Sequence, residues 1–330
     1  MDGKTNAFAG SAFHSLAYKI GYNEERLRYI VSHFRGQYRK RKELDKKNKE
    51  RLIFSPSQGL KKLQRSILAY ISKKTSFPET FHGYKKKRSN LTNARCHLNK
   101  RVVTKLDIKD FFPSVHFKKV FALFRSLGFN EQESKILSRL TTADYCLPHG
   151  FSTSPTLAVL MLRNLDKRLK TLFMKEKLSY TYTFFSDDIT ISGNMGIKTF
   201  EKLICKIFKQ EGFVINKDKI DEQPYWKKQE VTGIGVNKKF NVPYAYRHNL
   251  RAVINNCISS GPGTQITRFN AEFGSNKKTD ISLAKFKERL FGKLSYIKPI
   301  NRNLYDKLLA DFKRIDWNHN KPAVVFRKHD

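Results

Sequence analysis

Two adjacent acidic residues carry the clearest chemical signal in this sequence. Asp187 and Asp188 lie within residues 180–193, which read YTYTFFSDDITISG. The β-branched and aromatic residues on both sides favour a strand, a tight turn and a second strand. Two carboxylates side by side at a hairpin tip repel each other, and a divalent cation that prefers oxygen ligands, such as Mg²⁺, relieves the repulsion. The pair therefore indicates either a metal site or an ordinary turn, because aspartate is also common in turns.

A third carboxylate lies upstream, near the end of another expected strand. In the strand predicted over residues 102–108, alternation places Asp107 on the face opposite Leu106 and Ile108. The Phe-Phe-Pro sequence at 111–113 then ends the strand. An aspartate at a strand end, followed by an Asp-Asp hairpin, suits a two-metal phosphoryl-transfer centre, in which the metals activate an attacking hydroxyl and stabilise the leaving pyrophosphate.

The composition indicates a folded protein with a polyanionic partner. The 330 residues include 65 Lys and Arg against 29 Asp and Glu, a formal net charge of +36, and 39% are hydrophobic. Such a charge points first to nucleic acid. An anionic membrane surface is the alternative, but the cations are spread along the chain and no long apolar run is present. We expect a cytoplasmic location, since the start lacks a secretion signal and the four separated cysteines suggest neither zinc nor disulfides.

The expected elements place the carboxylates in an α+β fold. Residues 1–37 are expected to be a helical extension, in which Asn23 caps a helix. Around the Asp-Asp hairpin, the order strand, helix, hairpin, helix, strand is that of a ferredoxin-like split β-α-β arrangement, with the last strand expected at 213–215. From residue 244 the pattern is helical, with cations outside apolar stripes. The expected domains are therefore 1–37, 38–243 and 244–330.

Two basic segments and one loop are candidates for contact with nucleic acid or nucleotide. Residues 81–105 hold eight Lys or Arg and no acid, with Phe81 and Tyr84 among them, which suits a nucleic-acid groove or a triphosphate clamp. Residues 38–51 are also strongly basic, and a solvated face or loop is the ordinary explanation. The Gly-, Ser- and Thr-containing loop at 147–155 suits either phosphate contact or a simple helix cap.

Five short segments resemble, in their order along the chain, the motifs of reverse transcriptases. Three resemble motifs A, B and C, and two resemble the NAxxH and VTG segments of the bacterial retron branch. The resemblance covers about residues 38–243, and the C-terminal part more loosely. It implies a right-hand polymerase with fingers, a ferredoxin-like palm and a helical thumb at 244–330. In chain order the segments are NARCH at 93–97, LDIKDFF at 106–112, LPHGFSTSP at 147–155, FSDD at 185–188 and VTG at 231–233.

The resemblance also implies roles for individual residues. The catalytic residues would be Asp107, Asp187 and Asp188, which with Ile108 would hold two Mg²⁺ ions. Phe112 would pack under the incoming sugar and reject a 2′-hydroxyl, unless it is a plain core residue; Lys219 would protonate the leaving pyrophosphate, unless it is a solvated surface lysine. The nucleotide-binding set would be Arg51, Lys62, Arg65, Phe112, His149 and Lys219. The RNA-binding set would be Asn93, His97, Lys285, Lys287, Arg289 and Lys293.

Two positions depart from the family motifs. Phe185 replaces the tyrosine of the usual Y-x-D-D, which removes a hydroxyl beside the template and primer but keeps both metal ligands. His149 replaces the glutamine of the usual LPQG; it retains hydrogen-bonding capacity, and its protonation could make nucleotide binding sensitive to pH.

By resemblance, the chain is an RNA-directed DNA polymerase of the retron type. It would use dNTPs to copy a cognate structured non-coding RNA, primed from a guanosine 2′-hydroxyl, into branched RNA-linked single-stranded DNA (msDNA). A separate effector protein for anti-phage defence and a host ribonuclease H would be partners, and no membrane would be involved. The alternatives are another prokaryotic reverse transcriptase, of the group II intron or diversity-generating type, and a non-catalytic RNA-binding scaffold. The intact aspartates argue against the scaffold.

Overall fold

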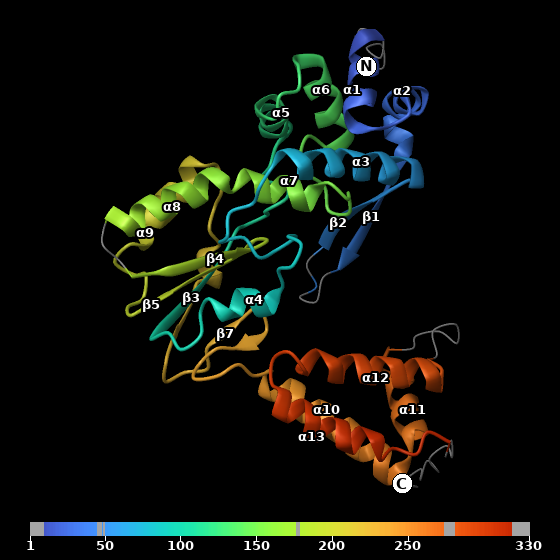
Figure 1. Cartoon of the computed structure of the whole chain (residues 1–330), viewed down its shortest axis with the longest axis vertical. Helices are drawn as coiled ribbons and strands as arrows, with labels where there is room; N and C mark the ends of the chain where they lie inside the picture. The colour runs from blue at the N-terminus through green and yellow to red at the C-terminus, as the bar shows by residue number, and fades with distance from the viewer. Residues whose placement is uncertain (1–9, 45–47, 49, 176–178, 274–280, 319–330) are drawn as a thin grey trace. The chain divides into compact units, whose positions relative to one another are not determined.

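The computed structural model describes residues 10–44, 48, 50–175, 179–273 and 281–318. The described residues fall into two compact units, one within 1–89 and 101–223 and the other within 90–100 and 224–330 (Figure 1). The second unit therefore combines the NARCH-containing segment with the C-terminal part of the chain. It begins earlier in the sequence than residue 244, where the helical thumb was expected to start.

The first unit opens with two helices, followed by two basic strands and a longer helix. Asn23 caps its helix as predicted, because its side chain accepts a hydrogen bond from the backbone N–H of Arg26 at 2.9 Å. The described residues of the basic run at 38–51 lie on two antiparallel strands and have mostly exposed side chains, so they form a solvated face built on strands. Ser57 then caps the next helix through the N–H of Leu60. These elements are α1 (Gly10–Ile20), α2 (Glu24–Ser32), η1 (Phe34–Gln37), β1 (Tyr38–Leu44), β2 (Glu50–Pro56) and α3 (Gln58–Lys74).

A four-stranded sheet forms the centre of the first unit. Its order is β4 (Thr181–Phe185), β5 (Asp188–Gly193), β3 (Val102–Asp107) and β6 (Asp221–Pro224), and β5 pairs antiparallel with both β3 and β4. The predicted mixture of helix and sheet is confirmed. Helices α8 and α9 lie side by side next to this sheet (Figure 1). The helices are α5 (Phe117–Ser126), α6 (Glu131–Thr141), α7 (Ser154–Met161), α8 (Arg163–Lys175) and α9 (Glu201–Gln210), followed by the 3₁₀ turn η2 (Lys217–Lys219).

Two local predictions were wrong in detail. The leucines at 157, 160, 165 and 169 repeat at the spacing of a single helix and predict one, but that helix is interrupted at Leu162, which ends α7 before α8 begins. The strand expected at 213–215 is reduced to one bridge between Ile215 and Ile108, because the chain then turns through η2. Strand β6 forms the edge of the sheet in its place.

The core of the first unit joins its helices to the sheet. Within that core, Phe81 stacks on Phe184 with ring centroids 4.8 Å apart, and both rings are fully buried. Burial of apolar side chains in such a core is the main stabilising contribution to the fold. The strand that carries the Asp-Asp turn is therefore held in place from its buried face.

The second unit is a small hairpin with a short helix and a set of longer helices. Helix α4 (Asn90–Arg95) contacts the two short strands β7 (Glu230–Val231) and β8 (Ile234–Gly235). The predicted apolar stripe is buried at Phe286, Leu290, Leu294 and Ile297. No helix in the described part of the chain is long and apolar enough to cross a membrane. The longer helices are α10 (Tyr244–Ser260), α11 (Pro262–Phe273), α12 (Leu283–Ile297) and α13 (Arg302–Lys313) (Figure 1).

Candidate active site

The three candidate catalytic aspartates lie at one end of the central sheet. Asp107 is the last residue of β3 and Asp188 is the first residue of β5, and the two are direct partners in the antiparallel register. Opposite residues in such a pair project from the same face, about 5 Å apart at Cβ. Asp187 lies in the turn between β4 and β5, and its carbonyl accepts a hydrogen bond from the N–H of Ile108 at 3.1 Å. The fold therefore brings the three aspartates predicted from the sequence to the same end of the sheet.

The electrostatics of this cluster favour a bound cation. The pKa of Asp188 is raised to about 6, first by burial of its carboxyl group and then by the negative charges of Asp187 and Asp107. Asp188 as a residue is exposed, while its carboxyl group is closely surrounded by protein atoms. The positive charges of Lys105 and Lys219 lower the pKa of Asp188, but they do not cancel the effect of burial and of the two neighbouring carboxylates. A carboxylate cluster with uncompensated repulsion is a suitable donor set for a hard divalent cation.

Lys219 contacts the candidate catalytic cluster directly. Its Nζ donates a hydrogen bond to Oδ2 of Asp107 at 2.8 Å, and the lysine side chain is 47% exposed. The turn η2 is anchored beside Asp107, because the N–H of Asn216 donates to the Asp107 carbonyl at 2.8 Å. Lys219 is therefore not a remote surface lysine, while its role in protonating pyrophosphate stays a prediction.

The side chains have the donor chemistry for a metal but are not gathered around one point. Among the described residues, no three His, Cys, Asp or Glu side chains are arranged to hold a metal ion. One oxygen of Asp107 is instead engaged by the Lys219 ammonium, which balances part of the local negative charge. The residues fit a divalent cation in ligand type and in charge, and Asp107, Asp187 and Asp188 are the side chains that would hold it.

Two other predicted nucleotide-binding residues, Phe112 and Arg51, lie near His149. The Phe112 ring meets the His149 ring edge-on, with centroids 4.9 Å apart. The His149 carbonyl accepts a hydrogen bond from the N–H of Phe54 at 2.7 Å, which ties its loop to β2, the strand that carries Arg51. Burial first, and then the positive charge of Arg51, lowers the pKa of His149, whereas Asp187 and Asp110 oppose that effect. The neutral form of His149 is therefore favoured.

The loop around His149 depends on a glycine. Gly150 has a φ of +105°, and a Cβ at this position would lie 2.3 Å from the carbonyl oxygen of Phe54. No side chain fits there without moving the backbone. The remaining predicted nucleotide ligands, Lys62 and Arg65, are exposed on α3, and their contact with a nucleotide stays a prediction.

Sequence reasoning missed a segment that packs directly against the Asp-Asp turn. Residues 80–82 extend the sheet edge: the N–H of Phe184 donates to the Thr80 carbonyl, and the N–H of His82 donates to the Phe184 carbonyl, both at 2.8 Å. Gly83 follows, and a Cβ there would lie 2.6 Å from the backbone nitrogen of Ser186. We call residues 80–84 the turn clasp. The sequence signal that could have indicated this segment is Gly83, which lies between aromatic residues at the start of a basic stretch.

The comparisons with known proteins agree with this geometry. The family model described as "Reverse transcriptase (RNA-dependent DNA polymerase)" matches residues 39–237. The chain belongs to the reverse transcriptase family. The match includes the three aspartates, the His149 loop and the turn clasp, and it confirms the predicted family. Reverse transcriptases use divalent metal ions, in agreement with the donor chemistry of the site.

Curated relatives of this reverse transcriptase family member are retron enzymes, as predicted. The Retron Mx65 reverse transcriptase of Myxococcus xanthus is 34% identical over 62% of this chain and 52% of its own length. The Retron Ec86 reverse transcriptase of Escherichia coli is 27% identical over 93% of this chain and 89% of its own length. The chain spans about half the length of the Mx65 and Mx162 relatives. A telomerase structure from Candida albicans is 12% identical and covers 84% of this chain and 63% of that chain. Its TM-score is 0.47, and this similarity is too weak to add to the assignment.

A buried histidine in the turn clasp, His82, should make the stability of this reverse transcriptase depend on pH. His82 is 1% exposed, and its pKa is lowered to about 4, first by burial and then by the positive charges of Arg88 and Lys85. The unfolded chain, with a histidine pKa near 6.5, binds more protons than the folded chain between about pH 6.5 and 4, so stability falls as the pH decreases through that window. The expected cost at pH 5, relative to neutral pH, is about 2 kcal/mol.

Chemical denaturation at pH 7 and pH 5 tests this contribution. The His82→Gln variant should lose less stability than wild type on acidification, and the exposed control His116→Gln should behave like wild type. An equal pH dependence in wild type and His82→Gln would contradict the assignment.

Two of the predicted RNA-binding residues need a correction. Asn93 and His97 are fully buried in the second unit, so neither side chain is available for direct contact with RNA. The Asn93 amide donates to the Thr232 hydroxyl at 3.4 Å, and that hydroxyl donates to the Asn90 carbonyl at 3.1 Å. The two retron-type segments, NARCH and VTG, therefore pack on each other, and a positioning role replaces the expected contact.

The four cations predicted on the C-terminal helices are exposed. Lys285, Lys287, Arg289 and Lys293 all lie on the solvent side of α12. Lys287 lies 5.1 Å from the ring centroid of Trp317, and Arg289 lies 5.3 Å from that of Phe269. These positions suit phosphate contact, and their selectivity for a particular RNA stays a prediction.

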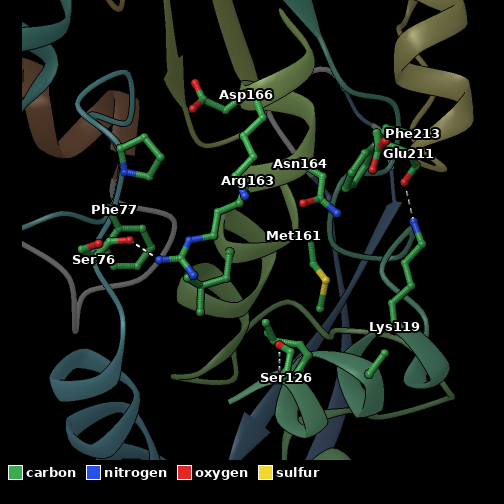
Figure 2. A pocket seen from close by; sticks show the side chains of 15 residues that line it. Ser76, Phe77, Lys119, Ser126, Met161, Arg163, Asn164, Asp166, Glu211 and Phe213 are labelled. Atoms are coloured by element: carbon green, nitrogen blue, oxygen red, sulfur yellow. Dashed lines mark hydrogen bonds between the residues drawn. The ribbon is translucent and has the colours of Figure 1, made fainter. Parts of the chain in front are cut away.

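A separate cavity lies in the first unit, away from the predicted site residues. It has a volume of about 820 Å³, and Figure 2 shows Lys119, Arg163 and Phe213 among its lining residues. Two of its cations are engaged: Lys119 donates to the Glu211 carbonyl at 2.9 Å and lies over the Phe213 ring, and Arg163 donates to the Ser76 carbonyl. None of the predicted catalytic or nucleotide-binding residues lines it. The cavity is not part of the candidate active site.

Proposed function

We propose that this chain is an RNA-directed DNA polymerase of the retron type. The observation that carries the proposal is the meeting of Asp107, Asp187 and Asp188 at one end of the sheet, beside Lys219 and the His149 loop. The family match and the retron relatives support the same activity. The catalytic elements would belong to the palm, β1, β2 and α3 to the fingers, and residues 244–330 to the thumb.

The chemistry would need Mg²⁺ at the carboxylate cluster. Two Mg²⁺ ions, held by the three aspartates and by Ile108, would supply activation of the attacking hydroxyl and stabilisation of the leaving pyrophosphate. Lys219 would hold a proton at Nζ within reach of the leaving group, since its ammonium already lies 2.8 Å from Asp107. The neutral His149 would act as a hydrogen-bonding group, while Arg51 would contribute positive charge toward the triphosphate.

The proposed substrate is a structured non-coding RNA. By likeness to retron enzymes, synthesis would start from a guanosine 2′-hydroxyl and yield msDNA, branched DNA joined to its RNA template. The exposed cations on α12 would contact phosphates, and phosphate contacts position an RNA without reading its sequence. We further propose a cytoplasmic setting in which a host ribonuclease H trims the template and a separate effector protein completes an anti-phage defence system.

One experiment tests the proposed reaction as a whole. The chain is expressed together with its neighbouring genomic DNA, and the copurifying nucleic acid is sequenced. We expect a single RNA species joined to complementary DNA, whose junction resists ribonuclease and alkali as a 2′ branch does. RNA without attached DNA would support the non-catalytic scaffold, and unbranched DNA copies of many RNAs would support another class of reverse transcriptase.

The proposed sugar gate gives a residue-level prediction. Phe112 is partly buried and packs on the His149 ring, so its removal should open space near the nucleotide sugar. Phe112→Ala is expected to increase incorporation of ribonucleotides relative to deoxyribonucleotides by about 10-fold or more, since packing discrimination is worth roughly 1–3 kcal/mol. Single-nucleotide incorporation kinetics measure the ratio.

The control for this variant is another partly buried phenylalanine. Phe77→Ala removes a ring that packs on the same core but lines the separate cavity in Figure 2. It should leave sugar discrimination unchanged. Equal discrimination in Phe112→Ala and Phe77→Ala would show that Phe112 is only a core residue.

A further inference from the structure

Two neighbouring aromatic side chains stand exposed at the tip of a turn in the second unit. Tyr225 and Trp226 are 58% and 71% exposed, and their ring centroids lie 5.2 Å apart at an interplanar angle of 86°. The N–H of Lys227 donates to the Pro224 carbonyl at 2.9 Å, so the two aromatics are the central residues of a β-turn. More than half of each side chain is exposed at the turn tip, and such a pair of exposed aromatic rings points to a ligand.

The turn is held firmly rather than left as a free loop. The side-chain amide of Asn237 donates to the carbonyls of Tyr225 and Lys227 at 3.1 and 2.8 Å, and its oxygen accepts the N–H of Gln229 at 2.9 Å. The Gln229 amide in turn donates to the Lys100 carbonyl at 3.0 Å. Both sides of the turn are thus fixed to the framework that contains the NARCH and VTG segments. Because the backbone of the turn is already fixed, it loses little conformational entropy when a ligand binds.

The surroundings of the turn are basic. Lys227, Lys228, Lys238 and Lys239 are all exposed, and the nearby acid Glu230 pairs with Lys228. Positive charge around an exposed aromatic pair favours a nucleic acid over an apolar protein surface, because each base can stack on a ring while its phosphate meets a lysine. The indole of Trp226 also offers a larger stacking face than a tyrosine or phenylalanine ring would.

We propose that Tyr225 and Trp226, together with these four lysines, form a stacking platform for single-stranded nucleic acid. The platform goes beyond the polymerase reaction: it names a binding site outside the aspartate cluster, and its ligand is an unpaired stretch of RNA or DNA. The rings take bases and the lysines take phosphates, so binding tolerates different sequences. Duplex, whose bases are already stacked, is a poor ligand for it.

Tryptophan fluorescence of the full chain gives a direct test. The chain has two tryptophans, and Trp317→Phe leaves Trp226 as the single reporter. Titration with a short single-stranded oligoadenylate should quench the Trp226 signal through stacking, and a duplex RNA of the same length should quench it far less. In the reciprocal Trp226→Phe protein, the remaining Trp317, which packs against Phe312, should change little. No quenching in the Trp317→Phe protein at saturating oligoadenylate would overturn the proposal.

Measured affinities for oligoadenylate, and their dependence on salt, separate the contribution of ring stacking from that of positive charge. Trp226→Ala should weaken oligoadenylate binding roughly 5- to 100-fold, and Trp226→Tyr should restore most of the affinity. The salt dependence should stay unchanged in Trp226→Ala. In the double variant Lys227→Gln with Lys228→Gln, its slope should fall by about 0.7 for every phosphate that is no longer neutralised. Tyr18→Ala, which removes an 86% exposed tyrosine from α1, is the matched control and should bind as wild type.

Two outcomes contradict the platform. Unchanged oligoadenylate affinity in a folded Trp226→Ala protein would show that the rings do not bind nucleic acid and would leave a protein surface as their partner. Equal losses in Trp226→Ala and Tyr18→Ala would show a general effect of removing surface aromatics. Neither measurement requires DNA synthesis, so the platform and the proposed polymerase activity succeed or fail separately.

Discussion

Replacing Asp187 or Asp188 with asparagine is expected to abolish DNA synthesis while RNA binding persists. Each substitution removes a negatively charged carboxylate, the proposed metal ligand, from a cluster in which Asp188 faces Asp107 across β5 and β3. The metal contribution to transition-state stabilisation is worth several kcal/mol, so the rate should fall by roughly 100- to 1,000-fold or more. Primer extension under single-turnover conditions measures the rate, and filter binding measures RNA affinity. Removal of divalent ions with a chelator should stop wild-type synthesis to the same extent.

The control for these variants is an exposed aspartate away from the cluster. Asp144→Asn removes a carboxylate that pairs with Lys40 on the basic hairpin, and it should extend primers at close to the wild-type rate. Synthesis within tenfold of wild type in both Asp187→Asn and Asp188→Asn would rule out the catalytic assignment. Loss of RNA binding along with synthesis would instead indicate that the variants are misfolded.

Gly83→Ala is expected to reduce DNA synthesis by about 100-fold although the residue carries no functional group. The added Cβ would lie 2.6 Å from the backbone nitrogen of Ser186 and 3.2 Å from the carbonyl carbon of Phe185. Neither contact is with a flexible side chain, so the turn clasp or the Asp-Asp turn must move. A displacement of about 1 Å in a catalytic group costs on the order of 100-fold in rate.

The comparison with a second glycine isolates this effect. A Cβ added at Gly36 would meet no atom within 4 Å, so Gly36→Ala should leave synthesis unchanged. Thermal unfolding and RNA binding of Gly83→Ala should remain near wild type, which separates a displaced turn from an unfolded protein. Full activity of a folded Gly83→Ala variant would mean that the clasp moves without disturbing the aspartates.

The sequence was sufficient for the features that depend on local chemistry. The β-branched and aromatic residues around Asp187 and Asp188 predicted the hairpin, and alternation predicted the strand that ends at Asp107. The cap at Asn23 and the apolar stripe of α12 were also correct. These features need only residues within a few positions of one another, because backbone propensity, capping and periodicity are short-range properties.

The family motifs predicted in addition that the aspartates of distant segments lie close together in the fold. Spacing alone left the aspartates open to an ordinary turn, and the ordered resemblance favoured the polymerase. The register that places Asp107 opposite Asp188 required the folded sheet, since one residue of slip would turn Asp188 to the other face.

The remaining features were decided by tertiary structure. The Lys219–Asp107 ion pair joins residues 112 positions apart, and the turn clasp packs Gly83 on Ser186 across a similar separation. Burial of Asn93 and His97 likewise follows from packing of NARCH against the VTG hairpin. Composition marked these segments as basic or polar, but side-chain exposure depends on which surfaces meet. Those contacts form only when apolar burial brings distant parts of the chain together, which no local pattern encodes.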